Sequence, residues 1–183
     1  MRLISELDTV DRRAKELAKE LTPFQLNWKP SQDAWSVGQC LEHLRVTNEV
    51  YLPAITASLK ARPLRAVQDI TPGWFGRWFI RNYIEPSSES KRARAPKKIA
   101  PVTRVGPDIL DRFLTSNQAA RELVGRASDY DVNRIRFKNP FIPMLRFTVG
   151  TGLEIVSRHQ PRHLLQAERV KHAVDFPGRE CDS

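Results

Sequence analysis

The segment Ser157-Arg-His-Gln-Pro-Arg-His-Leu-Leu-Gln-Ala-Glu-Arg-Val170 carries two histidines four residues apart. On an α-helix, side chains at positions i and i+4 lie on the same face, with Cβ atoms about 5–6 Å apart. His159 and His163 can therefore reach one metal ion if this segment is helical. The same spacing also occurs on solvated helix faces and among hydrogen-bonded polar groups of a core, so spacing alone leaves both interpretations open.

A third histidine lies far upstream, in the segment Trp35-Ser-Val-Gly-Gln-Cys-Leu-Glu-His-Leu-Arg-Val-Thr-Asn48. Ser36 followed three residues later by Gln39 is a capping-box pattern, which predicts that a helix begins there. His43 lies beside the apolar stripe of this predicted helix. The fourth histidine, His172, falls near the end of the last predicted helix.

These two segments carry the patterns Trp-Ser-x-x-Gln-x-x-x-His-Leu, from Trp35, and Arg-His-x-x-Arg-His-Leu-x-Gln, from Arg158. Their order resembles the DinB-like (YfiT-like) superfamily of metal-dependent enzymes. The resemblance is sharp around residues 35–48 and 158–170. It implies a four-helix bundle with a three-histidine metal site, whose ligands by position are His43, His159 and His163.

Pro161 departs from a regular helix because it lies between the two late histidines. A proline inside a helix removes one backbone hydrogen bond and collides with the carbonyl four residues back, that of Ser157, at a cost of about 3 kcal/mol unless the helix kinks or bulges. Two outcomes follow: a local bulge that aims the two histidines, or loss of the i, i+4 geometry. Pro53 interrupts the helix of His43 in the same way.

Apolar stripes at helical spacing predict an all-α protein, a four-helix bundle forming one domain over residues 1–183. The long helices are expected at 1–21, 36–61, 107–127 and from 145 or 151 to 174, with a short extra aromatic helix between the second and third, at 74–83. The long stretch between the second and third helices favours a topology with crossover connections. Residues 129–143 show no β-hairpin pattern and are expected to be an irregular connection.

The formal net charge is +9, and six of the positive charges lie in one acid-free stretch. These residues are Lys91, Arg92, Arg94, Lys97, Lys98 and Arg104. Such a stretch is typical of nucleic-acid binding, but this one matches no motif that reads a DNA groove. We therefore favour a solvated loop or a funnel for anionic substrates over a nucleic-acid-binding module, which stays the alternative.

No apolar run approaches the ~20 residues that span a bilayer, and the first residues lack a signal-peptide pattern. The sequence therefore predicts a cytoplasmic protein. The aromatic stripe from Trp74 to Tyr83 suits a membrane interface or a partner subunit, but we favour a cap over the bundle and its site. Cys40 is expected to be a small core residue rather than a fourth ligand, and Cys181 lies in a polar tail.

Three neutral imidazoles bind a divalent ion, with zinc and nickel the leading candidates, and leave positions for water or substrate. Such an ion activates water or a small thiol. Glu42 is expected to point away from His43, so no general base is evident, and Gln166 is the best-placed orienting group. The resemblance implies an enzyme whose reaction lies in the range from metal-dependent hydrolysis to the transfer of small thiols. It also implies a homodimer. A metal-binding bundle without catalysis is the other alternative.

Overall fold

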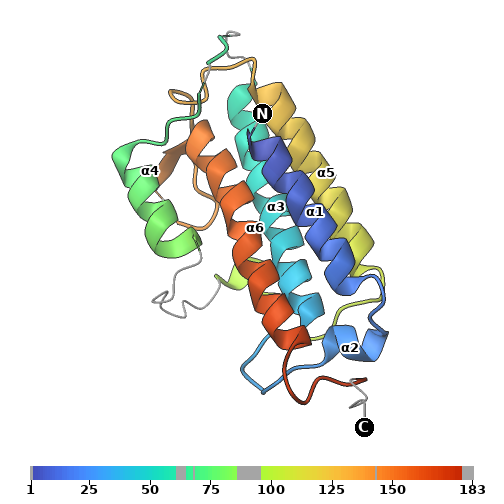
Figure 1. Cartoon of the computed structure of the whole chain (residues 1–183). Helices are drawn as coiled ribbons and strands as arrows, with labels where there is room; N and C mark the ends of the chain where they lie inside the picture. Colours follow the sequence, from blue (N-terminus) through green and yellow to red (C-terminus); the bar gives the residue numbers. More distant parts are fainter. Residues whose placement is uncertain (1, 61–64, 68, 86–95, 143, 179–183) are drawn as a thin grey trace.

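The computed structural model describes residues 2–60, 65–67, 69–85, 96–142 and 144–178. Four long helices form the body of this part of the chain (Figure 1). They are α1 (Arg2–Ala18), α3 (Val37–Leu59), α5 (Ile109–Ala127) and α6 (Val149–Lys171). The shorter helices are α2 (Pro23–Asn27), α4 (Trp74–Phe79), the π-helical turn η1 (Ile80–Ile84) and the 3-10 turn η2 (Lys97–Ile99). The predicted all-α four-helix bundle is confirmed.

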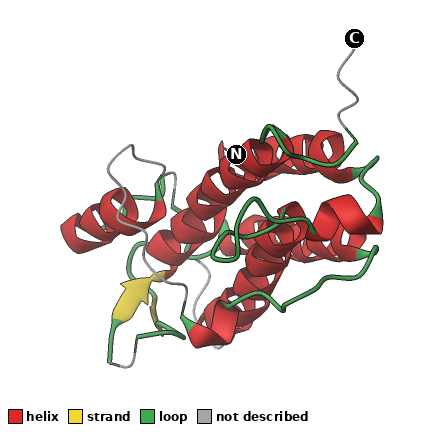
Figure 2. Cartoon of the chain, turned by 90° about the horizontal axis from the view of Figure 1, so that it is seen from below, coloured by secondary structure: helices red, strands yellow, loops and turns green. Residues whose placement is uncertain are grey.

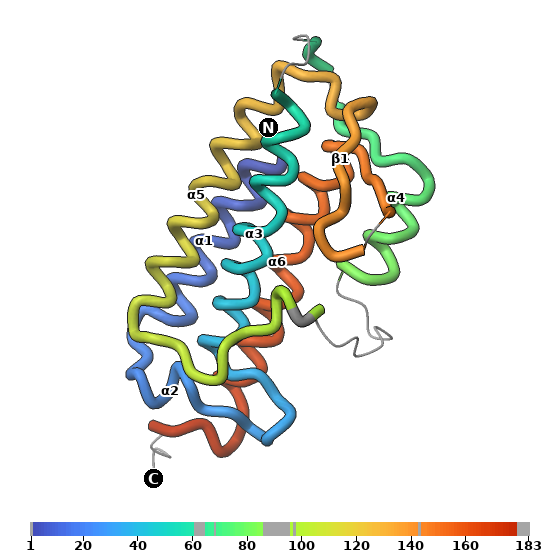
Figure 3. The backbone as a smooth tube through the Cα atoms, turned by 180° about the vertical axis from the view of Figure 1, so that it is seen from behind, coloured from blue at the N-terminus to red at the C-terminus, as the bar shows by residue number. Residues whose placement is uncertain are grey.

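The order of the helices in the bundle requires a crossover. Both α1 and α3 pack against both α5 and α6, so the consecutive helices α1 and α3 are diagonal to each other. The ion pair Arg13–Glu168 and the hydrogen bond from Lys171 to the carbonyl of Leu17 show that α1 and α6 run in parallel. Consecutive helices α3 and α5 also run in the same direction, so the chain must return along the bundle between them. Figure 3 shows residues 96–108 crossing α3 to reach the start of α5.

The start of α3 has the capping box that the sequence predicts. The hydroxyl of Ser36 accepts a hydrogen bond from the backbone N–H of Gln39 (3.1 Å), and the Gln39 side chain accepts one from the N–H of Ser36 (3.2 Å). The same side chain donates to the carbonyl of Val102 at 2.8 Å, which ties the crossover segment to the helix. A Cβ on Gly38 would lie 2.8 Å from the carbonyl of Leu26, so glycine permits α2 to approach α3 closely.

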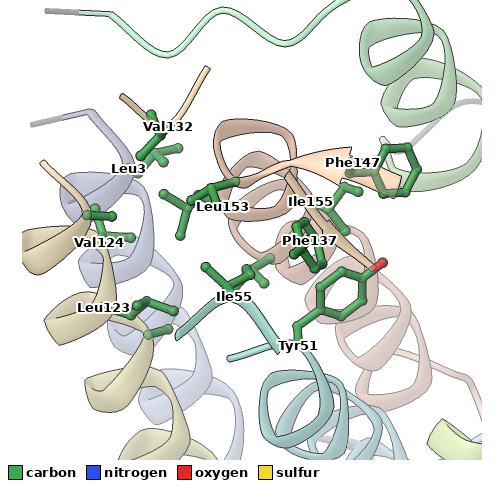
Figure 4. Close-up of a cluster of buried hydrophobic side chains, with 14 of the residues drawn as sticks. Leu3, Tyr51, Ile55, Leu123, Val124, Val132, Phe137, Phe147, Leu153 and Ile155 are labelled. Carbon is green, nitrogen blue, oxygen red and sulfur yellow. The ribbon is translucent and has the colours of Figure 1, made fainter. Parts of the chain in front are cut away.

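The apolar core has two clusters, one toward each end of the bundle. The first joins the beginnings of α1 and α6 to the ends of α3 and α5 (Figure 4). Its labelled members in the figure are Leu3, Tyr51, Ile55, Leu123, Val124, Val132, Phe137, Phe147, Leu153 and Ile155. The second cluster includes Val10, Ala14, Leu41, Leu44, Phe113 and Leu164. His43 lies between Leu41 and Leu44 in sequence, so the predicted site borders this second cluster.

Two short antiparallel strands precede α6, which makes the expectation of an irregular connection wrong. They are β1 (Arg136–Lys138) and β2 (Arg146–Thr148), paired with Phe137 opposite Phe147. Each strand buries only its central phenylalanine against the first core cluster. Alternation over three residues is too short to stand out in a sequence, and burial of the two rings supplies the stability that the local pattern lacks.

The aromatic segment packs on the protein itself, as expected, with two of its rings on the hairpin and its end, η1, against α6. The ring centroids of Phe75 and Phe79 lie 5.9 and 5.1 Å from that of Phe147, so α4 leans on the hairpin, to one side of the bundle (Figure 2). Trp74 and Trp78 remain exposed. The hairpin is a partner for these rings that the sequence did not reveal, and the expected cap over the site stays a prediction. Within the described residues, no helix is both long and apolar enough to cross a membrane.

Candidate metal centre

The bundle brings His43 of α3 together with His159 and His163 of α6, and we call these three residues the histidine cluster. One ring nitrogen from each lies within 4.8 Å of the others. The side chains of His43 and His163 are buried, at 2% and 8% exposure, whereas His159 is half-buried. His159 therefore has the largest exposed fraction of the three residues. His172, at the end of α6, is exposed and is not part of this group.

Pro161 does not destroy the i, i+4 geometry. The α-helix α6 continues through it from Val149 to Lys171, and the Nε2 atoms of His159 and His163 lie 3.0 Å apart. Pro161 has no N–H to donate to the Ser157 carbonyl, so one helical hydrogen bond is absent one turn before the second histidine. Helix α3 likewise continues through Pro53.

Two of the imidazoles are held through Nδ1. The Nδ1 of His43 lies 2.7 Å from the carbonyl oxygen of Ile99, in η2, and the Nδ1 of His163 lies 3.0 Å from Oε1 of Gln166. Both oxygens only accept, so each Nδ1 must carry the hydrogen. In a neutral ring this leaves Nε2 unprotonated, and the Nε2 of His163 lies 3.0 Å from that of His159. Gln166 thus orients His163, as expected. The contact between the Ile99 carbonyl and His43 was not predicted from the sequence.

Trp35 packs against two rings of the histidine cluster. Its ring centroid lies 4.9 Å from that of His43 and 5.6 Å from that of His163, stacked on the latter. Among the described residues, the ring contacts of the three imidazoles are with Trp35 and with one another. A signal existed, because Trp35 opens the same motif that ends at His43.

The other polar residues near the histidines in sequence have other partners. Asn48 and Gln160 both donate to Oδ1 of Asn117, in a network inside the bundle. Glu42 points away, as expected, and its carboxylate binds Arg45 at 2.7 and 2.9 Å. Within the described residues no carboxylate joins the histidine cluster.

Cys40 is fully buried in the second core cluster and is not part of the histidine cluster. Burial raises the pKa of its thiol, so the sulfur stays protonated and a poor metal ligand at neutral pH. Cys181 lies outside the described residues.

Burial lowers the pKa of all three imidazoles. For His43 the loss of solvation outweighs the opposing effect of the Ile99 carbonyl. Loss of solvation also lowers the pKa of His163 to about 3 and that of His159 well below its ordinary value, and in both cases nearby positive charge acts in the same direction. The three rings are therefore neutral at pH 7. Since a histidine must be neutral to bind a metal, no proton has to be displaced at that pH.

The donor set fits a borderline divalent ion. Nitrogens on a tetrahedral zinc ion, at Zn–N about 2.0–2.1 Å, are about 3.3 Å apart, so the cluster would have to contract by only about 1.5 Å or less. Ring nitrogens suit zinc and nickel, whereas magnesium and calcium need oxygen ligands that the cluster lacks. The cluster suggests a metal ion on these grounds.

Comparisons with known proteins place the chain in a family. The model of the DinB superfamily matches residues 6–167. The chain belongs to the DinB superfamily. The uncharacterized protein YuaE of Bacillus subtilis (strain 168) is 20% identical to it over 167 residues, which cover 86% of this DinB-superfamily chain and 90% of YuaE.

A solved structure shares the fold of this DinB-superfamily protein. YfiT from Bacillus subtilis superposes with a TM-score of 0.60 at 16% identity, over 93% of this chain and 85% of that chain. YfiT is described as a probable metal-dependent hydrolase with an unusual four-helix bundle topology. The likeness establishes the shared fold.

The basic stretch gives no support to the nucleic-acid alternative. Lys98 and Arg104 are exposed, whereas Lys91, Arg92 and Arg94 lie outside the described residues. No described element presents these charges on a groove-reading helix. The role of the stretch stays a prediction.

Replacing Gln166 by alanine is expected to weaken metal binding about 10- to 100-fold, the usual cost of removing a group that orients a histidine ligand. The imidazole of His163 would lose the acceptor that fixes its Nδ1–H. Zinc affinity measured by competition with a chromogenic chelator tests this. Gln118→Ala, on the exposed face of α5, is the matched control. Equal affinities in both variants would contradict the orienting role.

Proposed function

We propose that this protein is a metal-dependent enzyme that holds a divalent ion, zinc or nickel, on His43, His159 and His163. Its substrate is a small electrophilic molecule, attacked by water or by a small thiol. The observation that carries the proposal is the convergence of three imidazoles with two Nδ1 atoms fixed by acceptors. The family and the description of YfiT as a probable metal-dependent hydrolase support the same class.

The protein residues supply binding and orientation rather than proton transfer. A divalent ion on such a site supplies Lewis-acid activation of water, a thiol or a substrate carbonyl at neutral pH. Glu42 is held by Arg45, and Glu154 by Arg2 and Arg158, so these buried carboxylates are committed to ion pairs. Three ligands leave room for water or substrate, which distinguishes a catalytic site from a closed structural one.

The cluster joins helices α3 and α6 within the bundle, and we infer that residues 1–183 form one domain. The homodimer expected from the resemblance stays a prediction.

The test of the proposed function is a reaction screen. Protein loaded with zinc or with nickel is assayed against esters, amides, and pairs of a small thiol with an electrophile. We expect turnover in one of these classes, with loss of at least about 100-fold in His163→Ala, because removing a ligand removes the activating ion. Turnover that persists in His163→Ala would contradict the proposal. A bundle that binds metal and turns over none of the panel would point to the non-catalytic alternative.

A further inference from the structure

Arg162 is a half-buried cation beside the histidine cluster that has no carboxylate partner among the described residues. It follows His159 by three positions on α6, so the two side chains are neighbours on the helix surface. Within the part of the chain that the structure describes, its guanidinium donates one hydrogen bond, to the carbonyl oxygen of Tyr83 at 3.2 Å. A guanidinium has five N–H donors, so most of them have no partner among these residues.

The carboxylates around Arg162 are already neutralised by other arginines. Glu85 pairs with Arg158, and Glu154 pairs with both Arg158 and Arg2. Among the described residues, no carboxylate therefore compensates the positive charge of Arg162. An uncompensated arginine next to a cation site is an electrostatic cost that an anionic ligand would remove.

We infer that Arg162 forms an anion subsite beside His159 of the histidine cluster, and that the substrate carries a carboxylate or a phosphate group. The inference rests on the proposed function, because it assigns a substrate class to the same site. Neutral imidazole ligands leave the full charge of a divalent ion, and Arg162 adds one more. The planar guanidinium suits both groups, since it binds two oxygens of a carboxylate or phosphate in parallel. Recognition would occur beside His159, which Arg162 follows by three positions on α6.

An anion subsite at Arg162 predicts opposite changes of metal and anion affinity when the charge is removed, which an arginine with only a structural role does not. Neutralising Arg162 removes the repulsion between its charge and a cation on the cluster, so metal affinity should rise about threefold to tenfold. The same change removes the charge-assisted hydrogen bonds to the anion, so anion affinity should fall about 10-fold or more. The two affinities should therefore change in opposite directions.

The experiment compares wild type with Arg162→Gln, Arg162→Lys and Arg169→Gln. Arg169 lies seven residues further along α6, on the same face and exposed, so its replacement makes the same change of charge away from the cluster. Zinc affinity is measured by chelator competition. Acetate, inorganic phosphate and the neutral analogue acetamide are then titrated by calorimetry into zinc-loaded and into metal-free protein.

We expect Arg162→Gln to bind zinc more tightly and both anions more weakly than wild type, with the affinity for acetamide unchanged. Arg169→Gln should behave like wild type. The anion affinities of Arg162→Lys should lie between those of wild type and Arg162→Gln. An equal loss of anion affinity in Arg162→Gln and Arg169→Gln would mean that anions respond to the net charge of the protein, and it would contradict a subsite at Arg162. Unchanged anion affinity, or parallel losses of zinc and anion affinity, would also overturn it. If wild type binds no zinc, the proposed function fails, and the Arg162 dependence of phosphate binding to metal-free protein still decides the subsite.

Discussion

Zinc affinity is expected to fall by about 10² to 10³ when His163 is replaced by alanine, because about 3–4 kcal/mol of binding free energy accompanies each ligand of a zinc site. His163 supplies a buried Nε2 that lies 3.0 Å from that of His159. Without it, two imidazoles remain to hold the ion. His43→Ala and His159→Ala should show losses of the same order. Elemental analysis after dialysis, together with chelator competition, measures the effect.

The matched control is His172→Ala, which removes the fourth histidine of the chain from outside the cluster. It should retain about one metal ion per chain. Because His43 and His163 are buried, each variant must also show the helical circular dichroism of the wild type before its metal content is compared. Equal metal content in all four alanine variants would show that the ion is bound elsewhere.

Acidification is expected to destabilise the metal-free protein strongly between pH 7 and pH 5. The folded-state pKa of His163 is lowered to about 3, below the ordinary value of about 6.5 that it regains on unfolding. Between these two values the unfolded chain binds a proton that the folded chain does not, so the free energy of unfolding decreases as the pH falls. His163 alone should account for a loss of about 2 kcal/mol from pH 7 to pH 5.

His43 and His159 should add to this loss, because their pKa values are lowered too. Urea unfolding of chelator-treated protein at the two pH values measures the change. In His163→Leu, which keeps an apolar side chain in the same space, the loss on acidification should be about 2 kcal/mol smaller. An identical loss in both proteins would mean that other groups cause the acid sensitivity. Saturating zinc should reduce the effect at pH 7 to 6, because bound metal stabilises the folded state.

The features that the sequence determined by itself are local ones. The apolar stripes predicted the four long helices, since a 3.6-residue period reflects contacts within a few turns. The Ser36–Gln39 capping box was predicted because both of its hydrogen bonds join residues three apart. The pairing of His159 with His163 follows from the rise and turn of one helix, and it survives Pro161.

Only the tertiary structure decided what lies around the histidines. The carbonyl that fixes His43 belongs to Ile99, 56 residues away, in a crossover segment without a periodic pattern. The hairpin exists because Phe137 and Phe147 are buried together, and two rings of the aromatic segment pack on it. Whether a described carboxylate pairs with Arg162 depends on which arginines Glu85 and Glu154 bind. These contacts join residues that are far apart in the chain. They therefore depend on how the whole bundle packs and not on local sequence preferences.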